Sequence, residues 1–365
     1  MALQTVSGSL SIFFLFDVCD EIRLDELRKL VKAPPAGREP PFRQPTPEYV
    51  QFARPPVIEA IPPVELASGE RALGRIAYFE YGVVSLNLVV PFSGTWDQVV
   101  SFAGRWMERP ELERAAEELI GRHVAKARRA LVDEYPDRLN EDYYVVHLTP
   151  LLDSAQLPIK ADTLIESCGS YIAQIVRGET AAFSAAERRE ILESRMSYSD
   201  SDLMVAGWTA ALLYDTAEGA APTMQLLEYA NSKLLEFRHY DAVLSRLLSE
   251  VYRKLERGSG VLARWRFARE AARLNLIRLE IRELSERVDN SIKFLSDMFA
   301  ARLYRMAATR IGVPDYRTLV EQKLQSAGEL YGFMMDRFYQ GRAFVLELMV
   351  VIILVIELIF LFRGK

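Results

Sequence analysis

The chain of 365 residues is poor in cysteine, the residue on which disulfide frameworks and most structural zinc sites depend. Its only two cysteines, Cys19 and Cys168, are far apart and form no CxxC motif. This scarcity is typical of a protein in a reducing compartment and argues against a disulfide-stabilised fold. Both residues are expected to be ordinary core thiols.

Signatures of catalysis and of nucleic-acid binding are missing as well. The only histidines, His123, His147 and His239, have no partner at the spacing of a metal site or a catalytic triad. There is no HExxH motif, Walker loop or GxGxxG motif, so no catalytic residue, metal or cofactor is predicted. The formal charge of −5 gives no cationic surplus for phosphates. Direct nucleic-acid binding is therefore not expected, although a local basic face is not excluded.

The N-terminus lacks a targeting signal. The apolar segment LSIFFLF is closed by Asp17, and no basic residue precedes Arg23. It is therefore neither a secretory signal peptide nor a mitochondrial presequence. We expect residues 1–32 to form a strand followed by a short amphipathic helix.

Prolines are concentrated in one part of the chain. Ten of the 17 lie in residues 33–63, a composition that favours extended structure and disfavours a regular helix. We interpret this range as a linker or a strap over the surface.

Residues 64–220 alternate between β-rich and helical patterns. Two β-rich runs flank Gly82, helical patterns follow, and DYYVVHLTPLL and SDLMVAGWTAALLYDT return to strand. Such mixing predicts one α+β domain around a small sheet.

Residues 221–342 are almost continuously helical in pattern. Apolar or small residues step by three and four at positions 227, 230, 234, 237, 240, 244, 247 and 251, as in a coiled coil. After RGSG the pattern resumes, which predicts a helical hairpin with a second arm near residues 262–311. Pairing within one chain and pairing between chains are both open.

The C-terminal segment AFVLELMVVIILVIELIFLF, residues 343–362, contains 18 apolar residues and two glutamates. A helix of this length spans about 30 Å, the thickness of a bilayer core, so we predict a transmembrane helix rather than a buried core helix. Glu347 and Glu357 are membrane or pore candidates. Glu357 either faces copies of the same helix or lies neutral near the interface. With no signal ahead of it, the span predicts a tail-anchored protein of the bacterial inner membrane, with its N-terminal domain in the cytoplasm.

A charged stretch, EFRHYD, lies in the middle of the helical region. Arg238, Tyr240 and Asp241 are candidates for a ridge that contacts a partner, and the alternative is an ordinary ion pair between Arg238 and Asp241.

Three segments together resemble a known family. LLEYANSKLLEFRHYDAVLSRLLSEVYRKLE, RLNLIRLEIRELSERVDNSIKFL and the glutamate-bearing LELMVVIILVIELI are similar to the Rmd/YagE family, required for meiotic nuclear division, also called domain of unknown function 155. The resemblance covers most of the chain from about residue 75. It implies a membrane anchor and, from mitochondrial members, a link to translation near the ribosome. The missing presequence fits a bacterial member, and the family supplies no catalytic residues.

These features predict a non-enzymatic, tail-anchored membrane adaptor. It self-associates through a helical stalk, residues 221–342, and presents the α+β domain to a cytoplasmic protein or the ribosome. The main alternative is a homo-oligomeric channel or transporter whose pore is lined by the C-terminal helix, with Glu357 inward. An enzyme with a cleft assembled from scattered residues is a third alternative.

Overall fold

The computed structural model describes residues 5–31, 49–52, 54–65, 69–107, 109–257, 261–290, 292–295 and 298–363. They form two compact units. The first contains Met1–His239 and Arg287–Tyr316, and the second contains Tyr240–Glu286 and Arg317–Lys365. The chain therefore passes from one unit to the other three times.

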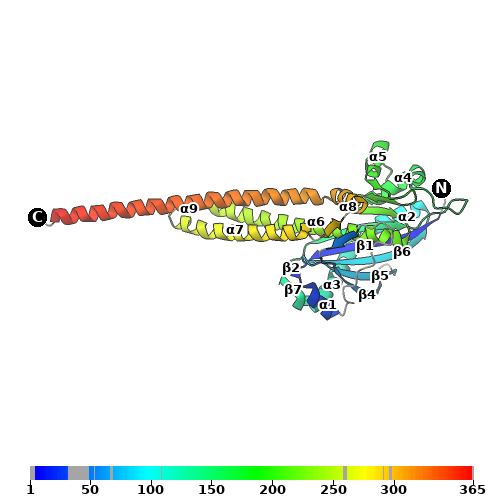
Figure 1. Ribbon diagram of the computed structural model, residues 1–365, viewed down its shortest axis with the longest axis horizontal. Helices are drawn as coiled ribbons and strands as arrows, with labels where there is room; N and C mark the ends of the chain where they lie inside the picture. Colours follow the sequence, from blue (N-terminus) through cyan, green and yellow to red (C-terminus); the bar gives the residue numbers. More distant parts are fainter. Residues whose placement is uncertain are drawn as a thin grey trace. The chain divides into compact units, whose positions relative to one another are not determined.

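The first unit is built on an eight-stranded mixed sheet (Figure 1). Neighbouring strands are antiparallel except β8 and β11, which run parallel. The order is β4 (Val57–Glu65), β5 (Arg71–Tyr78), β6 (Val83–Gly94), β1 (Val6–Asp17), β8 (Asn140–Leu148), β11 (Ala210–Tyr214), β10 (Leu203–Ala206) and β9 (Arg195–Met196). The predicted α+β domain is confirmed, with a larger sheet than expected.

Helices cover both faces of this sheet. One face carries α2, α3 and α4, and the other carries the first part of α6 together with α8. Along β1, Ile12 packs on the face covered by α2, α3 and α4. The neighbouring Ser11 lies on the other face, where its hydroxyl is 3.8 Å from the sulfur of Met224 in α6. Burial on both faces explains the nearly continuous apolar run of β1. The helices are α1 (Leu24–Val31), α2 (Trp96–Met107), α3 (Pro110–Ala127), α4 (Ala161–Arg177), α5 (Ala185–Glu193), α6 (Ala217–Arg257) and α8 (Met298–Ile311).

Two short strand pairs connect segments that are distant in sequence. β2 (Cys19–Ile22) pairs with β7 (Leu131–Glu134), and β3 (Tyr49–Phe52) pairs with β12 (Ile292–Leu295). β12 interrupts the helical arm expected over residues 262–311. Of the proline-rich range 33–63, residues 33–48 and 53 lie outside the described residues, and the rest contains β3 and most of β4.

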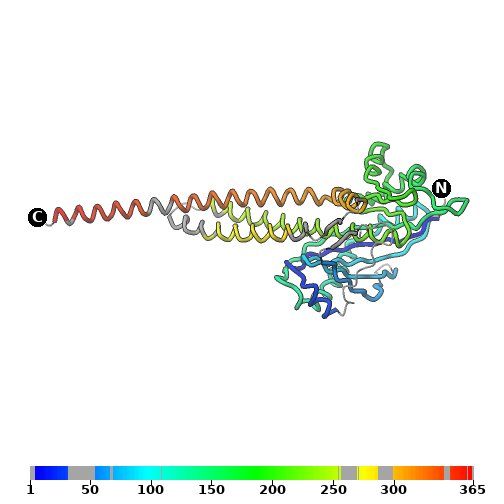
Figure 2. Tube along the Cα trace, in the orientation of Figure 1, coloured from blue at the N-terminus to red at the C-terminus, as the bar shows by residue number. Residues whose placement is uncertain are grey.

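The second unit is helical. The end of α6 packs against α7 (Val261–Asn290) and α9 (Val313–Arg363), which Figure 2 traces. Its apolar core contains Leu247, Leu248, Val251, Ala271, Leu274, Ala327, Leu330 and Met334. The helices therefore pair within one chain. All eight positions of the coiled-coil pattern predicted in α6 are buried. The positions up to Phe237 belong to the first unit, and those from Tyr240 belong to the second.

The predicted transmembrane helix is corrected by the structure. Within the described part of the chain, no helix has an apolar stretch long enough to cross a bilayer. The apolar side chains in the described C-terminal part of α9 are interrupted by two carboxylates, those of Glu347 and Glu357. The predicted span at 343–362, the tail anchor and the inner-membrane location are therefore wrong.

Candidate functional site: a cationic groove between β4 and α3

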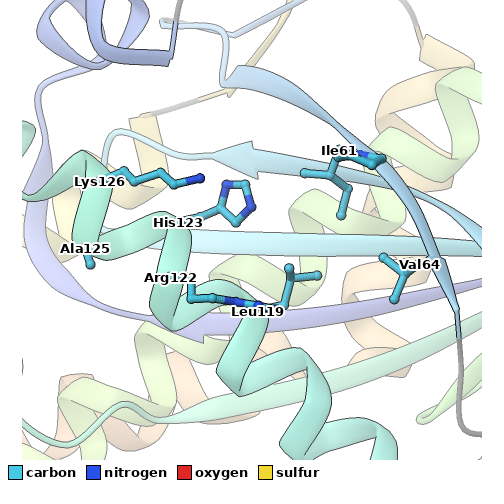
Figure 3. A pocket seen from close by; sticks show the side chains of 8 residues that line it. Ile61, Val64, Leu119, Arg122, His123, Ala125 and Lys126 are labelled. Carbon is cyan, nitrogen blue, oxygen red and sulfur yellow. The ribbon is translucent and has the colours of Figure 1, made fainter.

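A groove of about 550 Å³ lies between β4 and the C-terminal half of α3 (Figure 3). Strand β4 supplies an apolar wall, and α3 supplies the cationic side chains. The lining residues are Ile61, Pro62, Val64, Leu119, Arg122, His123, Ala125 and Lys126. The groove therefore joins an apolar surface to a cluster of basic groups.

The apolar wall follows from the position of β4 at the end of the sheet. Its pairing with β5 shifts register between Ile61 and Val64, where Pro62 and Pro63 lie. Proline has no N–H to donate and is tolerated on edge strands and at bulges. A bulge also bends the strand and redirects its side chains. The consecutive prolines thus shape the wall of the groove.

The cationic wall follows from the charge distribution along α3. Leu112, Ala116, Ile120 and Val124 are buried, which leaves the opposite face of the helix to solvent. Acidic residues lie in its first turn and basic ones toward its end, as the helix dipole favours. Arg122 and Lys126 are one turn apart and exposed, and no ion pair to either is found among the described residues. They are available to an anion.

His123 is held in place by a short chain of hydrogen-bonding groups. Its Nδ1 lies 3.1 Å from Oε1 of Glu59, while the Tyr78 hydroxyl donates to Oε2 of the same carboxylate at 2.7 Å. Burial, and then the adjacent Glu59, raises the pKa of Tyr78, so this hydroxyl remains a donor. The imidazole is 12% exposed. Glu59 therefore fixes the ring between the two exposed cations of the groove (Figure 3).

The residues singled out in the sequence lie elsewhere. Arg238 forms an ion pair with Glu141, whereas the carboxylate of Asp241 accepts from Lys323 at 2.5 Å. Tyr240 is buried. The three therefore do not form one exposed ridge, and Arg238 belongs to the first unit while Tyr240 and Asp241 belong to the second. Glu347 and Glu357 are exposed on α9.

The other two histidines have partners inside the first unit. His147 donates from Nε2 to the carbonyl of Asp215 at 2.9 Å, and Nδ1 of His239 lies 2.6 Å from Oδ2 of Asp17. Both cysteines are buried and free, as expected of core thiols. Among the described residues, no group of three or more His, Cys, Asp or Glu is arranged to hold a metal. Of the three histidines, His123 is the one that lines the groove.

Sequence reasoning missed the groove. The segment GRHVAKARR, residues 121–129, places five basic side chains at the end of α3 and in the 3-10 turn that follows it. This local excess of basic residues could have indicated the groove, but the acidic net charge of the whole chain drew attention away from it. The apolar partner on β4 lies some 60 residues earlier in a proline-rich stretch and gave no signal.

Comparison with known proteins places the groove in a matched domain. An uncharacterized protein of Methanocaldococcus jannaschii, MJ0711, is 21% identical over 198 residues, which cover 54% of this chain and 61% of that protein. No solved structure matches the chain. None of these comparisons bears on the Rmd/YagE resemblance, which stays a prediction. A family model described as "Uncharacterized protein MJ0711, N-terminal domain" matches residues 7–221, more than half of the chain, and the chain belongs to this family.

Proposed function

We propose that the protein is a non-enzymatic adaptor whose first unit binds an acidic, partly apolar segment of a partner protein in the groove between β4 and α3. The observation that carries this proposal is the pairing of exposed Arg122 and Lys126 with the apolar side chains of β4 across one groove. Two cations one helical turn apart attract carboxylates, and the apolar wall adds hydrophobic contact area.

A polypeptide is favoured because the groove follows a strand at the end of the sheet. Edge strands accept extended segments of other chains. Here Pro62 and Pro63 remove two main-chain donors, so recognition rests on side chains more than on strand pairing. The lining offers charge and apolar area, and its imidazole is committed to Glu59 through one nitrogen. These features support binding rather than catalysis.

Self-association through the second unit is the other part of the proposal. On α7 the exposed side chains Leu276 and Leu279 are three residues apart, outside the core shared with α6 and α9. Adjacent exposed leucines on a helix favour contact with another copy. Because the core of the second unit is buried within one chain, the face of α7 that carries Leu276 and Leu279 is left for contact with another copy.

The binding proposal is tested with a labelled peptide of alternating glutamate and valine, measured by fluorescence anisotropy on the full chain. Arg122→Glu with Lys126→Glu is expected to weaken binding at least tenfold, because each reversal replaces attraction by repulsion. The matched control is Arg114→Glu, which reverses an exposed charge on the same helix outside the groove.

Two further peptides separate charge from apolar contact. Alternating glutamate and serine keeps the charge, and alternating lysine and valine keeps the apolar side chains. Both are expected to bind more weakly than the glutamate–valine peptide. Equal weakening by Arg114→Glu and by the groove variant would contradict the proposal.

A further inference from the structure

A second cavity, of about 220 Å³, lies in the first unit where β10, β11, the first turns of α6 and α8 meet. It shares no lining residue with the groove. Much of its wall is apolar, formed by Met196, Leu203, Met204, Leu213, Leu226, Phe299 and Leu303. Taking about 30 Å³ for a water-sized group, it has room for about seven heavy atoms.

All charged side chains among the described lining residues are acidic: Asp202, Asp215 and Glu218. The backbone holds two of these carboxylates in place. Asp202 accepts the N–H of Tyr198 at 2.8 Å, and Asp215 accepts the N–H of Thr216 at 2.6 Å. Burial raises the pKa of Asp215, and the charge of Asp202 adds to this effect. The cavity therefore has a fixed acidic side that lacks a described counter-charge in its lining.

An aromatic pair adds to this preference for cations. The rings of Tyr198 and Phe299 pack edge to face with centroids 5.0 Å apart, and both line the cavity. Aromatic faces attract ammonium groups, and apolar walls accept the carbon chain that carries one. A hydrated metal ion would leave the apolar wall unused.

We propose that this cavity binds a primary organic amine, with the ammonium group among the three carboxylates and its aliphatic stem against the apolar wall. The ammonium supplies three donors, which matches an acceptor-only set. The cavity volume accommodates a stem of about six carbons. The site is independent of the groove and of the proposed adaptor role.

The experiment compares hexylammonium with hexanol, its uncharged counterpart of equal chain length, by calorimetric titration of the full chain. Hexylammonium is expected to bind at least tenfold more tightly, because hydrogen bonds to charged acceptors are stronger than neutral ones. Asp215→Asn with Glu218→Gln should weaken hexylammonium about tenfold and leave hexanol unchanged. Thr223→Phe, which fills the cavity from α6, should weaken both ligands.

The matched control is Glu193→Gln, which removes an exposed carboxylate of α5 outside the cavity and should change neither affinity. Thermal unfolding establishes that each variant is folded. If the double variant does not fold, Glu218→Gln alone carries the test, because Glu218 is exposed in the first turn of α6. Equal affinity for the two ligands, no binding of either, or an equal loss in Glu193→Gln would overturn the proposal.

Discussion

The carboxylate of Glu228 in α6 lies 2.5 Å from the guanidinium of Arg75 in β5. The Ser85 hydroxyl donates to the other oxygen of the same carboxylate at 2.7 Å. The Glu228 side chain is 4% exposed and that of Arg75 29%. This contact joins the helix to a sheet face that also carries the buried polar residues Ser11 and Asn87.

We expect Glu228→Leu to lower the free energy of unfolding by about 3 kcal/mol, because it leaves a partly buried guanidinium without its counter-charge. Urea unfolding measures the change. The control is Glu65→Leu. The ion-pair partner of Glu65 is Arg71, which lies on the same strand, β5, as Arg75. There the side chains are 75% and 76% exposed, and the expected loss is at most about 1 kcal/mol. Equal losses at the two sites would contradict the importance of burial.

Gly82 is expected to tolerate no side chain. Its φ is +96°, and an added Cβ would collide with the carbonyl of Cys19. Gly82→Ala should therefore destabilise the fold by more than about 2 kcal/mol.

Gly69 provides the matched comparison because its φ is +83° with nothing near the position of a Cβ. Gly69→Ala should cost about 1 kcal/mol, from backbone strain alone. Thermal unfolding of both variants separates the clash from the strain, and similar costs would show that the chain near Cys19 relaxes.

Asp17 is expected to make stability depend on pH. Burial, together with the nearby charge of Asp20, raises the pKa of Asp17 well above its ordinary value. The folded state therefore holds this proton more tightly than the unfolded chain, so ionisation of Asp17 lowers the free energy of unfolding as the pH rises above about 4. Groups that contribute to this environment include Tyr135 and His239.

Asp17→Asn removes this ionisation. Relative to the unmodified chain, the variant should gain stability as the pH rises above about 4, as measured by urea unfolding at several pH values. Asp25→Asn, at an exposed position in α1, should leave the pH dependence unchanged. A variant whose stability runs parallel to that of the unmodified chain would contradict the role of Asp17.

Self-association is expected to depend on the outer face of α7. Leu276→Glu with Leu279→Glu places two charges where another copy would pack, so native mass spectrometry should show a shift from oligomer to monomer. Gln322→Glu, at an exposed polar position of α9, is the control and should leave the mass unchanged. A monomeric unmodified chain would exclude this part of the proposal.

Much of the secondary structure could be predicted from local pattern. The Gly82 turn between β5 and β6, the start of α3 at Pro110 and the buried positions of α6 all agree with what the sequence indicates. These signals are turn residues, a proline in the first helical turn and apolar spacings of three and four. They can be recognised from one sequence because each acts over only a few residues.

The predictions that were wrong or missing concern strand pairing between distant segments and the apolar length that a membrane span needs. The pairing of β3 with β12 joins residues 49–52 to 292–295, and no local pattern encodes such a distant partner. The span predicted at 343–362 relied on apolar composition, and no helix of the described residues is long and apolar enough to cross a bilayer.

Local sequence pattern indicates most of the helices and strands, although β12 lies within an arm predicted to be helical. It also shows the lack of a recognisable catalytic motif and the excess of basic residues near Arg122. The surfaces on which those residues lie follow from the packing of distant segments. This packing brought Ile61 on β4 beside His123 on α3, and Asp202 near Asp215 at a cavity beneath α6. Helical and strand periodicity follow from neighbours in the chain, whereas a binding site depends on which distant segments pack together, and packing is set by the whole core.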